Sequence, residues 1–228
     1  MITLIVIMTT GCRKNEEIPD TITDVDGNVY HTLIIANQVW LKENLKTSRL
    51  KDGTAIPIVT VNSDWANLTA GAYCWYNNDS NLKDLYGALY NWHAVNTGKL
   101  CPTGWHVPDD TEWKELEKAL GMSQADADDL DWRGTNVGSK LAGDATLWTD
   151  GTLENDAEFG SSGFSAFPGG YRFSPGAFLC MGDYGLWWTA TEYSSIFVWS
   201  RYIGSDYSKV FRWYDDKGHG YSVRCIMD

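Results

Sequence analysis

The alternation of apolar and polar positions predicts a chain built mainly from short strands. Between Asp24 and Ile35, two strand-like runs flank Asp26–Gly27, a pair typical of a tight turn, so we expect a β-hairpin there. Further strand-like runs lie at residues 39–45 and 71–76, and beyond residue 158 glycines separate aromatic-rich runs at hairpin-like spacing. Because no fixed repeat and no Pro/Ser-rich linker interrupts residues 24–228, we expect them to form one domain.

One main helix is expected at about residues 108–120. Asp109 is a good N-cap, and Glu112 three residues later completes a capping box. The apolar stripe of this helix follows the i, i+3, i+7 spacing and consists of Trp113, Leu116 and Leu120. Ser123 is positioned to cap a second, shorter helix. Many strands with few helices indicate an α+β fold.

The first 23 residues are interpreted as a signal peptide followed by a tether. The apolar run at residues 2–8 is far shorter than the roughly 20 residues that a membrane-spanning helix needs. Small residues before Cys12 resemble the lipobox of bacterial lipoproteins, so residues 1–11 are expected to be cleaved and Cys12 acylated. Residues 12–23 would then tether the domain to the outer membrane or cell surface. A cytosolic chain with an apolar first strand is the alternative.

No Lys or Arg precedes this apolar run, so we expect the natural start to lie further upstream. The run also lacks the leucine that usually stands three residues before the lipidated cysteine, a position held here by Thr9.

Charge and aromatic content narrow the class of partner. With 18 Lys+Arg against 30 Asp+Glu, the formal net charge is −12, which disfavours binding to nucleic acid and adsorption to anionic lipid. The chain also has 12 Trp, 12 Tyr, 7 Phe and 22 Gly. This mixture is more typical of compact, turn-rich β or α+β folds than of helical bundles.

Four cysteines remain besides Cys12, and they are Cys74, Cys101, Cys180 and Cys225. An even number in an exported domain predicts two disulfides, for which three connectivities are possible. No CxxC pair or Cys/His cluster is present, so structural zinc is not expected. The acidic turn near Asp24 lacks the later glutamate of an EF-hand loop, so the hairpin is favoured over a calcium loop.

Many short motifs, in order along nearly the whole chain, resemble one family. They include residues 26–30, 40–45, 71–79, 86–92, 101–108, 163–166, 168–172, 187–192 and 220–225. Together they are similar to the Fibrobacter succinogenes major paralogous domain, a family common in Bacteroidetes-like bacteria and typically found on exported lipoproteins. The resemblance covers about residues 24–228 and implies no particular activity.

A more distant resemblance bears on the fold. Residues 105–113 and 220–225 are similar to segments of formylglycine-generating-enzyme-like proteins, which share the C-type-lectin-like architecture. This implies twisted antiparallel sheets, one main helix, a second short helix and long loops. In such folds the last strand returns beside the first helix, so the resemblance favours Cys101–Cys225, which leaves Cys74–Cys180. A bridge between Cys74 and Cys225 is the alternative.

Two arginines in strand-like, apolar surroundings are expected to be structural. Arg224 corresponds to the arginine of the terminal strand in the distant relatives, and Arg201 lies between apolar neighbours. Because a buried charge needs a partner, we expect Arg224 to pair with a carboxylate such as Glu112 or Glu192.

The catalytic motifs of the distant relatives are missing. The paired copper-binding cysteines have no counterpart around Cys180, and the four histidines show no iron-binding spacing; these are His31, His93, His106 and His219. No nucleophile elbow or phosphate-binding loop is present. We therefore expect no enzyme activity, metal or cofactor. The alternative is a hydrolase that cleaves polysaccharide with a carboxylate pair.

The favoured function is a binding or adhesion domain for a glycan or protein. Tyr and Trp offer large amphipathic faces at low entropic cost. Trp105, Trp113, Trp187 and Trp188 lie within family motifs and are assigned to the core. The candidate ligand-binding residues lie in the C-terminal part and are Phe173, Phe178, Tyr202, Tyr207 and Trp213. The competing interpretation is that these rings only pack against the sheet.

Overall fold

The computed structural model describes residues 18–228. The expected signal peptide and Cys12 lie outside these residues. In the described part of the chain, no helix is both long and apolar enough to cross a membrane.

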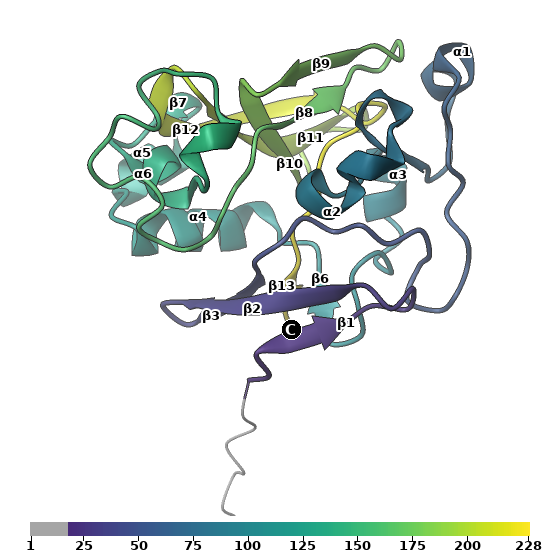
Figure 1. Cartoon of the computed structure of the whole chain (residues 1–228), viewed down its shortest axis with the longest axis horizontal. Helices are drawn as coiled ribbons and strands as arrows, with labels where there is room; N and C mark the ends of the chain where they lie inside the picture. Colours follow the sequence, from purple (N-terminus) through teal and green to yellow (C-terminus); the bar gives the residue numbers. More distant parts are fainter. Residues whose placement is uncertain (1–17) are drawn as a thin grey trace, which may run out of the picture.

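Two larger sheets and one small sheet form the framework (Figure 1). The five-stranded sheet has the order β1-β2-β3-β13-β6 and consists of β1 Thr21–Thr23, β2 Val29–Ile35, β3 Gln38–Leu41, β13 Ile226–Met227 and β6 Trp105–His106. The six-stranded sheet has the order β7-β12-β11-β10-β8-β9 and consists of β7 Asp131–Arg133, β12 Tyr207–Asp216, β11 Phe197–Gly204, β10 Tyr184–Glu192, β8 Gly169–Arg172 and β9 Phe178–Met181. β4 Tyr73–Cys74 and β5 Leu89–Tyr90 pair separately. The named strands pair antiparallel except β8 and β10.

The helices are short and lie in the connections between strands. They are α1 Asn62–Ala66, α2 Lys83–Tyr86, α3 Trp92–Val95, α4 Asp110–Ala119, α5 Gln124–Asp128 and α6 Val137–Leu141, with 3-10 turns η1 Tyr76–Asn78, η2 Ser80–Leu82 and η3 Ala145–Leu147. The predicted main helix is confirmed as α4, and its capping box is present in both directions between Asp109 and Glu112. Ser123 caps α5 as expected. Curled antiparallel sheets with a few short helices confirm the α+β class.

The N-terminal hairpin is confirmed, but it begins before the expected boundary at residue 24. β1 pairs with β2 from Thr21↔His31 to Thr23↔Val29. Ile22 packs against the core, so residues 21–23 belong to the sheet and not to a free tether. In the turn, Asp24 accepts hydrogen bonds from the backbone of Asp26 and Asn28, and Gly27 has φ +83°.

The two larger sheets share one core. A single apolar cluster contains Val39 of β3 together with Leu186 and Trp188 of β10. The four tryptophans assigned to the core are all buried, and they are Trp105, Trp113, Trp187 and Trp188. Buried apolar contacts therefore hold the six-stranded sheet against the five-stranded sheet.

A buried ionic network fastens α4 to the six-stranded sheet. Glu117 of α4 is fully buried and accepts hydrogen bonds from Arg133 of β7 and Arg201 of β11. Asp110 binds Arg201 and also Arg212 of β12. Burial opposes ionisation of Asp110, but Arg212 and Arg201 outweigh it and hold the pKa of this carboxyl well below its usual range. Arg201 is thus a structural residue that joins β11 to α4 through two carboxylates.

The prediction that Arg224 pairs with a carboxylate is wrong. The Arg224 guanidinium is buried and donates to the backbone carbonyls of Lys42 and Phe164 and to the side-chain oxygen of Asn44. Its guanidinium carbon also lies 4.3 Å from the ring centroid of Phe164. Burial lowers the pKa of Arg224 to about 9. The carbonyls of irregular loops, which no sheet satisfies, replace the carboxylate.

The proposed carboxylates have other partners. Glu112 caps α4 and contacts His106 at 2.9 Å, whereas Glu192 pairs with Lys217 at 2.6 Å. Partial burial opposes protonation of His106, but hydrogen bonds to Asp228 and Glu112 outweigh it and raise its pKa.

One of the two expected disulfides is present. Cys101 and Cys225 are bonded across a sequence separation of 124 residues, which ties the C-terminal strand to the segment before β6. The Cys74–Cys180 bridge is wrong, because both residues are free thiols. Cys74 is buried in β4 within the small cluster around Trp65, whereas Cys180 is only half-buried on β9. Burial raises the pKa of the Cys74 thiol to about 12.

Candidate functional site

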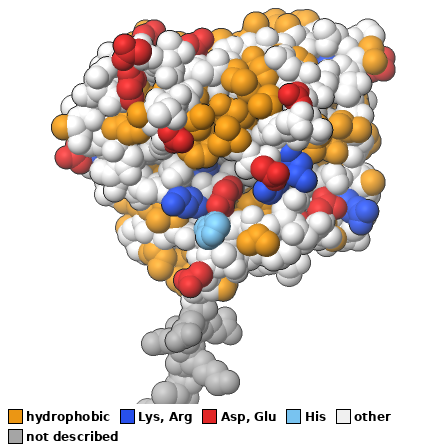
Figure 2. Space-filling model, viewed as in Figure 1, with side chains coloured by type: hydrophobic (Ala, Val, Ile, Leu, Met, Phe, Trp, Pro, Cys, Tyr) orange, Lys and Arg blue, Asp and Glu red, His pale blue; other side chains and the backbone are white. Residues whose placement is uncertain are grey.

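An aromatic groove lies on one face of the six-stranded sheet. Along β11 and β12, Arg201 and Arg212 face α4, so strand alternation places Tyr202 and Phe211 on the opposite face. The groove has a volume of about 260 Å³ and is lined by Trp132, Tyr171, Cys180, Tyr184, Leu186, Tyr202 and Phe211. In the view of Figure 2, hydrophobic side chains form a broad patch on the half of the molecule that contains this sheet.

Stacked rings form one end of the groove. Trp132 of β7 stacks on Tyr207 of β12 with ring centroids 4.0 Å apart and an interplanar angle of 17°. Trp132 also packs against Phe211 at 5.1 Å, and Phe211 stacks on Tyr202 at 5.2 Å. Tyr207 is 39% exposed, so part of this stack is open to solvent. Such a surface can stack against a flat, amphipathic ligand.

A polar cluster adjoins the groove at Tyr202. Tyr202 and Ser200 both donate to the same oxygen of Asp215, and the hydroxyls of Tyr202 and Tyr221 lie 3.1 Å apart. Burial, reinforced by the Asp215 charge, raises the pKa of Tyr202 well above its ordinary value, so this phenol remains a hydrogen-bond donor. The cluster offers hydrogen-bonding groups beside the apolar rings.

The rings continue from this cluster to Phe173. His219 lies 5.6 Å from Tyr221 and 5.0 Å from Phe173, which is 40% exposed. The Nδ1 of His219 accepts a hydrogen bond from the backbone of Ser174, and burial lowers the pKa of this imidazole.

The structure brings only some of the candidate residues to the groove. Tyr202 lines it, Tyr207 stacks on its rim, and Trp213 packs against Phe211 at 5.9 Å. Phe173 lies at the far end, beyond His219. Phe178 belongs elsewhere, since it packs against Tyr76 and the guanidinium of Arg172.

Comparison with known proteins identifies the family. The profile of the Fibrobacter succinogenes major domain matches residues 33–227. The chain belongs to this family. No curated protein and no solved structure matches the chain.

In this member of the Fibrobacter succinogenes major domain family, Tyr202 is the one sequence candidate among the residues that line the groove. The sequence analysis did not single out Trp132 in the groove or Asp215 beside it. Trp132 lies on β7, far from the candidate segment in sequence, and reaches the groove only because β7 pairs with β12. Asp215 follows Trp213 at the period of a strand, so the pattern of residues 211–215 contained a signal for it.

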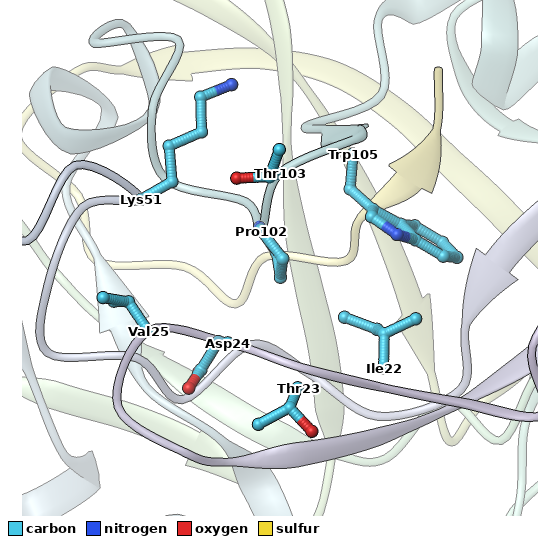
Figure 3. A pocket seen from close by; sticks show the side chains of 8 residues that line it. All are labelled: Ile22, Thr23, Asp24, Val25, Lys51, Pro102, Thr103 and Trp105. Carbon is cyan, nitrogen blue, oxygen red and sulfur yellow. The ribbon is translucent and has the colours of Figure 1, made fainter.

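A second cavity suits a ligand less well. It has a volume of about 320 Å³, lies near β1, and is lined by Ile22, Thr23, Asp24, Val25, Lys51, Pro102, Thr103 and Trp105 (Figure 3). Trp105 is 5% exposed, and Asp24 is already bonded to its own turn. In Figure 3 the Lys51 amine extends away from Asp24. This cavity therefore has neither an open ring face nor converging polar groups.

The described residues contain no group of three or more His, Cys, Asp or Glu side chains that could hold a metal ion. Among residues 18–228, Asp215 is the one carboxylate that hydrogen-bonds to a tyrosine of the groove. The rings of the groove and the Asp215 cluster beside it are suited to stacking and hydrogen bonding.

Proposed function

We propose that this domain is a non-catalytic binding module whose aromatic groove takes a glycan, on a protein anchored by lipid in the cell envelope. The observation that carries the proposal is the open Trp132–Tyr207 stack beside the Tyr202–Asp215 cluster. Sugar rings have one apolar face and a rim of hydroxyl groups, so they need both features at once.

Groove size and rigidity support this proposal. The volume of about 260 Å³ and the open aromatic rim suit part of a longer chain better than a fully enclosed small molecule. The rings are held by long strands that the Glu117 network fastens to α4, so little ordering entropy is lost when a ligand stacks.

Replacing Trp132 with alanine should weaken glycan binding by about tenfold or more, because it removes the stacking face and the support of Tyr207. A glycan array first selects the ligand, and calorimetry on the purified protein then compares dissociation constants. Tyr193→Ala is the matched control, since Tyr193 is 49% exposed and stacks on Tyr214 outside the groove. Equal losses in the two variants, or an array without any binding, would count against the groove.

The fold supports the same class of function. We propose the C-type-lectin-like architecture, in which long loops and a curled sheet present ligand sites. In support, β13 inserts between β3 and β6, and the Cys101–Cys225 bridge ties this C-terminal strand to the segment that leads into α4.

Lipid anchoring is expected at Cys12, on the strength of the short apolar run and the small residues before it. Intact-mass analysis of membrane-extracted protein should show cleavage before Cys12 and added acyl chains. Two or more chains anchor a protein durably, so it should stay with membranes at high salt. Cys12→Ser should release it, and an unprocessed soluble wild-type protein would contradict the prediction.

A further inference from the structure

The carboxylate bound to the groove-lining Tyr202 has no cationic partner in the described structure. Ser200 and Tyr202 both donate to Oδ2 of Asp215, which leaves Oδ1 without a hydrogen-bond donor among residues 18–228. Within the same residues, no Lys, Arg or His forms an ion pair with Asp215. The contrast with Asp110 and Glu117, which are surrounded by arginines, shows that this charge is not part of the structural network.

Aromatic rings lie beside this carboxylate. Tyr202 contacts it directly, and Tyr221 joins Tyr202 through their hydroxyls. Tyr171 packs edge-on against Tyr221 with centroids 5.7 Å apart, and Tyr171 also lines the groove. Ring faces and a carboxylate are the two groups that attract an organic cation in proteins.

We propose that Asp215 and the adjoining tyrosines form a subsite for a protonated amino group, so that the preferred glycan is one with free amino sugars. This inference rests on the proposed function and specifies its ligand. The sugar ring would stack on the groove's aromatic side chains while its ammonium group approaches Oδ1 of Asp215. The ligand then supplies the positive charge that the protein does not.

Net charge favours the same ligand class. The chain carries −12 at neutral pH, so its field attracts a polycationic glycan and repels an acidic one. A neutral or acetylated glycan could still stack on Trp132 and Tyr207, but it would leave the Asp215 charge unpaired. A preference for amine over acetamide therefore combines the overall field with the local Asp215 charge, and a charge-matched control variant separates the two.

The test compares two probes of equal length, a tetramer of β-1,4-linked glucosamine and its fully N-acetylated counterpart. At about pH 6, where the amines are protonated, calorimetry on the full protein should show the amine form binding about tenfold more tightly. Added salt should reduce that difference, because it screens the charge pair. Equal affinities, or tighter binding of the acetylated form, would overturn the amine subsite.

The variant Asp215→Asn should remove the preference while leaving binding of the acetylated tetramer nearly unchanged. Glu115→Gln is the matched control, because it removes one negative charge from the exposed side of α4, across the sheet from the groove. If Asp215→Asn keeps the full preference, the amine subsite is wrong. Binding of both tetramers without preference overturns the amine subsite but leaves the glycan proposal standing. Binding of neither also overturns the amine subsite, whereas the glycan proposal is overturned by a glycan array without any binding.

Discussion

Glu117→Gln is expected to lower the free energy of unfolding by about 3–5 kcal/mol. Glu117 has no exposed surface and is the shared partner of Arg133 and Arg201, with N–O distances of 2.7 Å in both ion pairs. The neutral amide removes the negative charge that offsets the cost of burying these two guanidinium groups. Urea denaturation at neutral pH, followed by tryptophan fluorescence, measures the change.

Glu115→Gln provides the control on the same helix. Glu115 pairs with Lys118 at 2.6 Å, but its side chain is 53% exposed, so water already solvates the charge. Its loss should change the free energy of unfolding by less than about 0.5 kcal/mol. If the two variants were equally stable, the buried network would not hold α4 on the sheet.

Loss of the Cys101–Cys225 bridge should cost about 5 kcal/mol. The bond closes a segment of 124 residues, and in the chain-entropy model a loop of this length restricts the unfolded chain strongly. The double variant Cys101→Ser/Cys225→Ser, and wild-type protein in reducing agent, should therefore unfold at similar, much lower urea concentrations. Non-reducing peptide mapping checks the connectivity.

The free thiols supply the matched control for this experiment. Cys180→Ser should keep both wild-type stability and the loss of stability on reduction, since Cys180 is half-buried and unbonded. Cys74 should resist alkylation until the protein unfolds, because burial raises its thiol pKa to about 12. A Cys74–Cys180 or Cys74–Cys225 peptide would contradict the observed pairing.

Local patterns were sufficient for the elements whose stability is local. The capping box of Asp109 and Glu112 and the turn between Asp24 and Gly27 depend on residues within a few positions of each other. The sequence therefore located α4 and the N-terminal hairpin, although it placed the turn one residue too late. The family motifs likewise spread along the whole chain and identified it as a member of the Fibrobacter succinogenes major domain family.

Pairing between distant residues was harder to predict. That Arg224 is buried followed from its apolar neighbours, but its actual partners are carbonyls at Lys42 and Phe164, about 180 and 60 residues away in sequence. Any carbonyl left unsatisfied by a sheet can receive a guanidinium, and no sequence pattern marks which carbonyls those are. The wrong prediction of a Cys74–Cys180 bridge has the same cause, because an even cysteine count does not show which thiols lie close enough to bond.

The candidate site divides in the same way. By itself the sequence determined that aromatic residues concentrate in the C-terminal part, and strand alternation separated Tyr202 from Arg201. Only the tertiary structure decided which rings form a groove, because Trp132 arrives from β7 through long-range pairing and Phe178 turns to a different cluster. Side-chain period is a property of one strand, whereas a binding surface depends on the order of strands in the sheet.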